Sequence, residues 1–510
     1  MRSRKRLSAL VAVGVAAVML SACSGGSEGG DGSSSGSLVL GSPLAPTTFA
    51  ANDVSWANEA PYIQAVYDTL LRATPEGEIE PWLATEWSYD DERTVLTMAL
   101  RDDVVFTDGT PFSAETAAQS VLGFKGGTSP YAFLLGRVAD ATAIDATTLQ
   151  ITLSEPDPGL LHGLTTAAGV QGSPAAFDSP EAQTSPVGSG PYLLDTAATV
   201  VGSSYVFTRN PDYWAPETQY YDDLTVTVLD NAQAQMSALQ GDQVDVVNLL
   251  DSSAADQLEA SGFVLHPAEL DVRSLLLFDR DGQLVPELAD VRVRQAIAHA
   301  FDRDAILQAL ADGRGTVTGQ MFGESSPAFD PGLDQRYPYD PDRARQLLAE
   351  AGLANGFTLP LPQIPTGTTI QYDLIRQYLG DVGVTVELTQ VPLQNAIADL
   401  TQAKWSAGLI SLLQPATDWE TAQTFLTEDA TWNPFHRPDA TVEQLVATIQ
   451  QGTESEAAEA GRRLNEYVVE QAWFVPWYRV QSVIVSDSDI QVERQNDNIF
   501  PYLWNITPAQ

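Results

Sequence analysis

One segment of this 510-residue chain carries the clearest indication of its fold: Leu100-Arg101-Asp102-Asp103-Val104-Val105-Phe106-Thr107-Asp108-Gly109-Thr110-Pro111-Phe112-Ser113-Ala114. The apolar residues at its centre predict a strand that ends near Phe106. Asp108-Gly109 is typical of a tight turn, because glycine adopts backbone angles that other residues avoid. Ser113 can then cap a helix that begins at Ala114. The segment therefore predicts a strand, a tight turn and a capped helix in immediate succession.

Residue patterns elsewhere in the chain predict a mixture of strands and helices. Alternating apolar residues predict strands over 37–41, 94–100, 148–153, 224–229 and 384–388. Apolar residues at helical spacing predict helices over 60–71, 232–239, 291–312, 341–351 and 370–380. No internal repeat is visible, and the chain is too long for a single hydrophobic core. These patterns predict an α/β protein with at least two lobes.

The N-terminus has the features of an export signal that ends at the only cysteine of the chain, Cys23. Four basic residues within the first six precede an uncharged apolar run over 7–20, which is too short for a stable membrane span. Leu20-Ser21-Ala22-Cys23 resembles the bacterial lipoprotein box. That resemblance implies cleavage of a signal peptide, residues 1–22, and diacylglycerol on the Cys23 sulfur. An ordinary signal peptide with a chance cysteine is the alternative.

Residues 23–37 are mostly Gly, Ser, Asp and Glu, a composition typical of a flexible tether. The mature protein is therefore expected outside the cytoplasm, anchored to the outer face of the cell membrane by the lipid on Cys23. Two acyl chains make such an anchor stable, whereas one gives only marginal membrane affinity. With a single cysteine, the chain forms no intrachain disulfide, so its stability depends on its core.

The charge of the chain is strongly negative: −41 overall, and −45 once the four basic residues of the signal are removed. Such a surface repels nucleic acid and anionic lipid headgroups, so neither is an expected partner. It favours cationic or zwitterionic ligands. An acidic surface that serves only solubility is the alternative explanation.

Motifs for catalysis and metal binding are missing from the sequence. The four histidines lie far apart, and no His-Glu-x-x-His, Walker loop or dinucleotide fingerprint occurs. One Gly-x-Ser-x-Gly occurs, at 32–36, but it lies in the expected tether. Asp279-Arg280-Asp281-Gly282 begins like a calcium loop but lacks the later ligands, so a plain turn is expected there. We therefore expect no enzymatic activity, no bound metal and no other cofactor.

Further segments follow one another in a fixed order on either side of Leu100–Ala114. They are Tyr67-Asp68-Thr69-Leu70-Leu71, Ile79-Glu80-Pro81-Trp82-Leu83-Ala84, Pro186-Val187-Gly188-Ser189-Gly190-Pro191-Tyr192, Arg209-Asn210-Pro211-Asp212-Tyr213-Trp214, Ala238-Leu239-Gln240-Gly241-Asp242-Gln243-Val244-Asp245 and Val291-Arg292-Val293-Arg294-Gln295-Ala296-Ile297. In type and order they resemble the family 5 solute-binding proteins of bacterial ABC importers, a family that handles oligopeptides, dipeptides, nickel and some oligosaccharides. We interpret the motifs as markers of the fold rather than as ligand contacts.

The resemblance implies a two-lobed α/β fold of the periplasmic-binding-protein type II class, with an extra subdomain inserted in the first lobe. Lobe I would comprise 38–50, 186–270 and 472–510, and the inserted subdomain would be 51–185. Lobe II would be 271–471. The chain would cross between the lobes near Leu270–Arg273 and near Gln471–Pro476, and these two crossings would form a hinge that closes on a solute.

The resemblance also implies where the solute binds. Peptide binders of the family hold the α-amino group of the ligand with an aspartate in a Trp…Asp-Pro-Asp-like segment, and the matching stretch here is Leu409–Glu420. Asp418 stands at the position of that aspartate, although leucine replaces the tryptophan and the triplet is Asp418-Trp419-Glu420. A helix N-cap is the alternative role for Asp418. Trp419 is expected either to stack on the ligand or to pack in the core.

Three further residues are candidates for the ligand site. Trp56 follows the first predicted strand and could face the cleft from the other lobe. Gln371 and Gln414 are polar candidates from lobe II.

The sequence thus predicts a monomeric lipid-anchored receptor that captures a peptide or peptide-like solute by lobe closure. It would deliver the solute to ABC permease subunits that work with a cytoplasmic ATPase. The alternatives are the same fold binding an oligosaccharide, an opine or a metal chelate, and a role as a sensor or chaperone. An exported hydrolase is a further rival, but the sequence offers no motif for it.

Overall fold

The computed structural model describes residues 36–177, 179–365, 369–495 and 498–509. Gly36–Gln510 forms one compact unit. The predicted signal peptide, Cys23 and nearly all of the predicted tether lie outside the described residues.

A nine-stranded sheet runs through the body and connects its two hydrophobic cores. Eight strands follow in the order β10 (Tyr192–Leu194), β11 (Ser204–Arg209), β12 (Asp223–Val228), β1 (Ser37–Ser42), β13 (Val246–Asn248), β19 (Phe474–Ser486), β14 (Val264–Leu277) and β18 (Ala407–Leu413). The ninth, β15 (Gly315–Val317), pairs with β19. β1 is parallel to both of its neighbours, and the strands from β13 to β18 are antiparallel.

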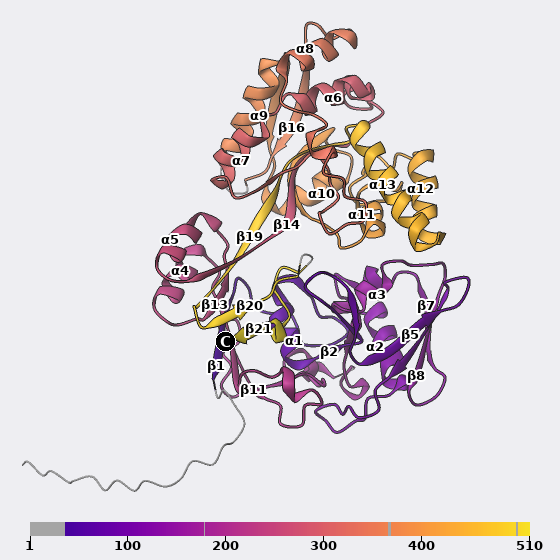
Figure 1. Cartoon of the computed structure of the whole chain (residues 1–510), viewed down its shortest axis with the longest axis vertical. Coiled ribbons are helices and arrows are strands. Elements are labelled where there is room, and N and C mark those ends of the chain that lie inside the picture. Colours follow the sequence, from indigo (N-terminus) through magenta and orange to yellow (C-terminus); the bar gives the residue numbers. More distant parts are fainter. Residues whose placement is uncertain (1–35, 178, 366–368, 496–497, 510) are drawn as a thin grey trace, which may run out of the picture. The chain divides into compact units, whose positions relative to one another are not determined.

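β14 and β19 form a long antiparallel ribbon within this sheet (Figure 1). β13 pairs with β19 only over 484–486, and β18 pairs with β14 only from residue 271 onward. Where residues 267–269 of β14 pair with residues 481–483 of β19, no other described strand therefore lies beside them. The register shifts between Glu269 and Asp271 next to this narrow section, and such a bulge bends a strand and increases its twist.

One core is built from residues between 38 and 265 together with 483–506, and we call this part lobe I. Its four-stranded antiparallel sheet has the order β5 (Ala84–Tyr89), β6 (Val95–Leu100), β8 (Thr148–Leu153) and β7 (Val138–Ala143). The helices of lobe I are α1 (Ala60–Val66), α2 (Ala114–Gly126), α3 (Leu160–Gly163), α4 (Ala232–Gln240) and α5 (Ala255–Ala260). Its short strand pairs are β2 (Asp68–Thr69) with β9 (Val170–Gln171), β3 (Leu71–Ala73) with β4 (Ile79–Pro81), and β20 (Ile490–Val492) with β21 (Ile506–Pro508).

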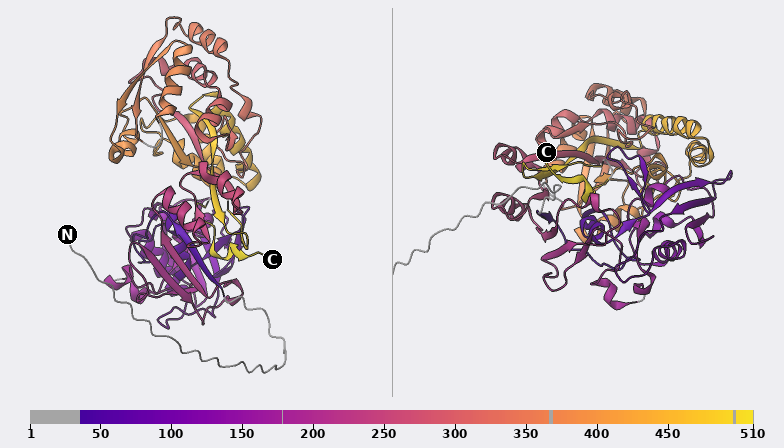
Figure 2. Two further views of the ribbon diagram at one scale, coloured as in Figure 1. Left: turned by 90° about the vertical axis from the view of Figure 1, so that its left-hand side faces the viewer. Right: turned by 60° about the horizontal axis from the view of Figure 1, so that its bottom comes forward.

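The other core is built from residues between 272 and 480, and we call this part lobe II. One side of it packs the parallel pair β16 (Phe357–Gln363) and β17 (Val384–Gln390) with α6 (Val291–His299), α7 (Arg303–Ala311), α8 (Pro341–Glu350) and α9 (Ile370–Asp381). The other side contains α10 (Ala396–Thr401), α11 (Asp418–Phe425), α12 (Ala440–Gln451) and α13 (Glu454–Glu470). The left view of Figure 2 shows β19, in yellow, running from the elements of lobe I to those of lobe II. The residue boundaries of the lobes and subdomain remain a prediction.

Most of the strands and helices expected from the sequence are confirmed within two residues. The strand expected to end near Phe106 was wrong, because only an isolated bridge between Val105 and Pro111 forms there across the tight turn. Ser113 caps α2, and Thr116 completes the capping box by bonding back to the Ser113 backbone. In the Pro186–Tyr192 motif, the backbone passes very close to the backbone of Val66 and Tyr67. A Cβ on Gly188 would lie 2.1 Å from the Val66 carbonyl oxygen, so only glycine fits there.

Two predicted helices were wrong in length. The helix expected over 60–71 ends at Val66, because Tyr67 is extended and Asp68-Thr69 pairs with β9 instead. The helix expected over 291–312 is two helices, α6 and α7. Asp302 lies between them and caps α7 by accepting a hydrogen bond from the Ala305 amide.

Asp68 connects distant parts of lobe I from a fully buried position. Its carboxylate accepts hydrogen bonds from Trp82 Nε1 (3.0 Å), Ser189 Oγ (2.8 Å), Tyr213 Oη (2.9 Å) and Trp214 Nε1 (3.0 Å). Burial raises the pKa of Asp68, and the four donors oppose that shift. Four of the sequence motifs, including the one that contains Asp68, thus meet at this carboxylate, which explains why they mark the fold.

A second group of acidic residues lies beside the end of β19. Partial burial and the negative charges of Asp245, Asp489 and Asp242 raise the pKa of Asp487 to about 6. The unfolded value is about 3.9. Asp487 therefore contributes stability that is fully present below about pH 4 and is lost as the pH rises through 6.

We expect Asp487→Asn to raise the melting temperature at pH 7, because it removes a carboxylate that its neighbours repel. Solvent screening keeps the gain small, about 1–2 °C. The gain should disappear below about pH 4, where Asp487 is protonated in both states. Melting curves from pH 3.5 to 8 measure this, with the exposed Asp212→Asn as the control. A gain independent of pH would contradict the assignment.

Candidate functional site

A cavity of about 310 Å³ is lined by residues of both lobes. Lobe I contributes aromatic and apolar side chains, among them Trp56, Tyr131 and Phe133. Lobe II contributes the turn after β18, Leu413–Ala416, and Trp419 at the start of α11. We call this space the aromatic cavity.

The aromatic wall of lobe I combines a fixed residue with an exposed one. Trp56 is buried, and its Nε1 donates a hydrogen bond to Asn498 Oδ1 at 2.8 Å, so its ring is held in one orientation. Tyr131 and Phe133 stack with their ring centroids 6.4 Å apart. Phe133 is 71% exposed, unusually high for a large apolar residue, and it offers surface that a bound solute could cover.

The predicted anchor Asp418 lies at the first position of α11, but its carboxylate is already engaged inside lobe II. Ser326 Oγ donates a hydrogen bond to Asp418, and burial raises the pKa of this carboxyl group. The cap of α11 is Thr417, which forms a capping box with Glu420, so the alternative of Asp418 as the N-cap was wrong. Asp418 lines a neighbouring cavity of about 660 Å³, and Trp419 lies between the two spaces.

Trp419 packs in the core of lobe II and also lines the aromatic cavity. Its position is therefore compatible with both of the predicted roles, core packing and stacking on a ligand. Its ring belongs to a core cluster of lobe II and lines the aromatic cavity. The guanidinium carbon of Arg137, from lobe I, lies 4.8 Å from the ring centroid.

The two glutamine candidates have different surroundings. Gln414 lines the aromatic cavity, and its Nε2 donates to the Met321 carbonyl at 3.1 Å. Gln371 is buried on α9, where its Oε1 accepts a hydrogen bond from Arg273, and it lines neither cavity. The structure thus brings Trp56, Gln414 and Trp419 together around the aromatic cavity. Asp418 lines the neighbouring cavity instead, and Gln371 lines neither of the two.

The charged residues of the aromatic cavity were missed by the sequence interpretation. Arg137 pairs with Glu155 at 2.8 Å and donates to Gln423 Oε1 of lobe II at 3.2 Å. Asp157 accepts a hydrogen bond from the Gly159 amide at 3.1 Å, and burial raises its pKa. The only local signal was Pro156-Asp157-Pro158-Gly159, which indicates a turn but not a site.

A histidine of lobe I and a glutamate of lobe II also face each other at this cavity. His162 Nδ1 lies 3.8 Å from Glu420 Oε1, so the two attract each other when the histidine is protonated. Two further hydrogen bonds join the lobes nearby: Gln450 Nε2 donates to the Pro156 carbonyl at 2.9 Å, and Arg93 Nη1 to the Gly452 carbonyl at 3.1 Å. Polar contacts thus join the two lobes at this cavity and beside it, and separation of the lobes would break them.

The part of the chain that the structure describes contains neither a metal site nor a membrane-spanning helix. No cluster of three or more His, Cys, Asp or Glu side chains there could hold a metal ion. None of the helices found there is long and apolar enough to cross a membrane.

Comparison with known proteins identifies the family. The model of bacterial extracellular solute-binding proteins, family 5 middle, matches residues 78–434. The chain belongs to this family. The prediction of the family from the sequence motifs is thereby confirmed.

Individual relatives agree with this assignment. The nickel-binding periplasmic protein of Escherichia coli K12 is 26% identical over 305 residues, which cover 58% of this chain and 56% of that protein. Glutathione-binding protein GsiB of the same strain is 26% identical over 404 residues, which cover 77% of this chain and 75% of that protein. The match to the nickel-binding protein thus spans little more than half of that relative.

A solved structure confirms the two-lobed fold. The periplasmic binding protein DppA of Helicobacter pylori, in complex with the peptide STSA, superposes with a TM-score of 0.76 at 20% identity. The superposition covers 93% of this chain and 98% of that one. At this identity the likeness shows the fold alone.

We expect Arg137→Ala to favour an open arrangement of the lobes, because it removes the contacts of Arg137 with Trp419 and Gln423. A loss of about 1 kcal/mol would shift the closed-to-open ratio about fivefold. Small-angle scattering of the solute-free body should then show a larger radius of gyration.

Arg72→Ala is the matched control for this variant. Arg72 also stacks on a tryptophan and pairs with a glutamate, but both partners, Trp82 and Glu80, lie in lobe I. Equal radii for both variants and the parent protein would show that Arg137 does not hold the lobes together.

Proposed function

We propose that this chain is a lipid-anchored receptor of an ABC importer that encloses a peptide or peptide-like solute between its lobes. The observation that carries the proposal is the aromatic cavity, whose walls come from both lobes. Closure around a solute would bury it against Trp56, Phe133 and Trp419, and opening would release it to the permease.

A peptide fits the chemistry of this cavity. Its aromatic and apolar walls suit amino-acid side chains, and its charged groups, Arg137 with Asp157 and Glu420, include both signs, as a zwitterionic chain requires. The relatives support the same class. One is named for glutathione, itself a peptide, and DppA was solved with a tetrapeptide. The anchoring lipid on Cys23, the monomeric state and the permease with its ATPase are parts of the same proposal.

The test is a thermal-shift screen of the body, residues 36–510, against peptides of two to eight residues, oligosaccharides, opines and nickel chelates. A ligand at 100 times its Kd stabilises the folded state by about 2.7 kcal/mol, enough to raise the melting temperature by several degrees. We expect peptides to produce this shift. A shift with sugars, opines or chelates alone would remove the peptide assignment and leave the receptor role.

Phe133→Ala tests whether the aromatic cavity is the binding site. We expect it to weaken peptide binding about tenfold or more without lowering the melting temperature, because the ring is exposed until a solute covers it. Ile144→Ala is the control, since Ile144 is also an exposed apolar residue of lobe I but does not line the cavity. Calorimetry gives both dissociation constants, and equal losses would place the solute elsewhere.

Asp418→Ala tests the anchor predicted from the sequence. It leaves the Ser326 hydroxyl without its acceptor, so some loss of stability is expected in any case. Peptide affinity is therefore the informative quantity. An unchanged Kd would show that the carboxylate acts only inside lobe II.

Cys23→Ser tests the anchor to the membrane. Serine cannot form the thioether with diacylglycerol, so we expect the variant protein in the soluble extracytoplasmic fraction and the parent protein in the membrane fraction. Metabolic labelling with a palmitate analogue should mark only the parent. Labelling of both would place the lipid on another residue.

A further inference from the structure

A second cavity, of about 290 Å³, lies beside the narrow section of the β14–β19 ribbon. β14 contributes Glu269 to its wall, β19 contributes Arg479, and the loop over 323–325 contributes Glu324. The turn Gln414–Ala416 lines both this space and the aromatic cavity. We call this space the ribbon cavity. A solute that occupied both would therefore pass along that turn.

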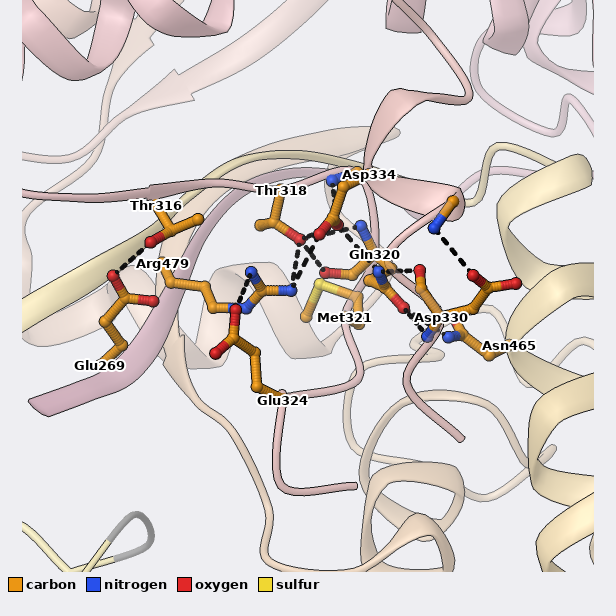
Figure 3. A network of polar contacts seen from close by, with 12 residues as sticks. Glu269, Thr316, Thr318, Gln320, Met321, Glu324, Asp330, Asp334, Asn465 and Arg479 are labelled. Atoms are coloured by element: carbon orange, nitrogen blue, oxygen red, sulfur yellow. Dashed lines mark hydrogen bonds and ion pairs between the residues drawn. The ribbon is translucent and has the colours of Figure 1, made fainter. Parts of the chain in front are cut away.

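Arg479 is the central group of the ribbon cavity (Figure 3), and only 1% of its side chain is exposed. Nη2 donates a hydrogen bond to Thr318 Oγ1 at 2.9 Å and lies 3.6 Å from Asp334 Oδ2. Nε and Nη1 have no hydrogen-bond acceptor within the described residues. A buried guanidinium with two unused donors costs free energy, and a ligand oxygen would remove that cost.

Asp334 balances the charge of Arg479 on the side away from the cavity. Its Oδ1 accepts hydrogen bonds from Thr318 Oγ1 (2.7 Å), Gln320 Nε2 (2.8 Å) and the Gly319 amide (3.0 Å), which fix the carboxylate in place. Arg479 lies equally close, 3.6 Å, to Asp334 and to Glu324, so these two carboxylates share its one positive charge. Together with Glu269, the carboxylates around the guanidinium outnumber it.

Two carboxylates line the ribbon cavity itself, those of Glu269 and Glu324. Glu324 Oε1 lies 3.6 Å from Arg479 Nη1, and the Glu324 side chain is 64% exposed. Glu269 accepts a hydrogen bond from Thr316 Oγ1 at 2.8 Å. Burial raises the pKa of Glu269, the hydrogen bond from Thr316 and the positive charge of Arg479 lower it, and the negative charge of Glu324 raises it again. The cavity thus has an excess of negative charge beside unused N–H donors.

Few chemical groups can both bind to the two glutamates and accept hydrogen bonds from Arg479. A free carboxylate would accept from Arg479 but would be repelled by both glutamates. A simple cation would satisfy the glutamates but leave the Arg479 donors unused. The amino end of a peptide matches both, because an ammonium group and a carbonyl oxygen lie two carbon atoms apart.

We infer that the ribbon cavity holds the free amino terminus of a peptide solute, with its ammonium group between Glu269 and Glu324 and its first carbonyl oxygen facing Arg479. This inference rests on the proposed function and adds an orientation to it. The following residues of the peptide would run past Gln414–Ala416 into the aromatic cavity. The anchor for the amino group would then lie in a different place from the predicted Asp418.

The test uses Ala-Phe-Ala, together with any other peptide of the screen that binds and lacks Lys and Arg. Each is prepared with both ends free, with an acetylated amino end, and with an amidated carboxyl end. We expect acetylation to weaken binding to the parent protein about tenfold or more, because it removes the only cation of the peptide. Amidation should have a much smaller effect.

Glu269→Gln and Glu324→Gln then locate the contact. Each should weaken binding of the free peptide several-fold and leave binding of the acetylated peptide unchanged. Glu466→Gln, an exposed position on α13 of the same lobe, controls for the loss of one negative charge. Arg479→Lys should weaken both peptide forms, because both keep the first carbonyl. Melting curves without peptide verify that each variant is folded.

Two results would overturn the inference and leave the proposed function standing: equal affinity for free and acetylated peptides, or unchanged affinity of both glutamine variants for the free peptide. Failure of every peptide, whatever its end groups, to bind the parent protein would overturn the inference and the proposed function together. If Arg479→Lys fails to fold, the glutamine variants and the peptide forms still decide the question.

Discussion

The pairing of β14 with β19 is the interaction on which the rest of this structure depends. Their backbone hydrogen bonds join the strands of lobe I to those of lobe II, and over three residue pairs no other strand of the described residues lies beside them. A ribbon of two strands bends and twists more readily than a broad sheet. The register shift at Leu270 lies at the edge of this section, so the same backbone both connects the lobes and permits them to move.

Both cavities depend on that ribbon. The Gln414 amide donates a hydrogen bond to the Leu270 carbonyl at 2.8 Å, which attaches the turn shared by the two cavities to the bulge. Arg479 and Glu269 are themselves residues of the ribbon. A change in its bend would move the polar groups of the ribbon cavity relative to the aromatic wall of lobe I. A solute held in the ribbon cavity would thus be linked to any bend of the ribbon through a few residues.

Local features of the fold were predictable from the sequence, and long-range ones were not. The cap at Ser113 and the strands of alternating apolar residues depend on neighbours within a few positions. The helix over 60–71 failed because Asp68 has partners as far away as Trp214, and no local pattern reports them. The same holds for the sites. Trp56 and Trp419, which line the aromatic cavity, were expected from a position and a motif. Arg137 and Arg479 were not, because they contact partners far away in the sequence, Gln423 and Glu324 respectively.

Lobe I is completed by residues 498–503, and this affects the order in which the chain can fold. Tyr502 Oη donates to the Thr165 carbonyl, the Leu503 amide donates to Gln64, and Trp56 is held by Asn498. The partners in these hydrogen bonds lie 337 to 442 positions apart, so the core of lobe I is incomplete until both ends of this long segment have come together. Contacts between such distant residues form slowly, because the entropy of closing a long loop is lost before they stabilise the fold.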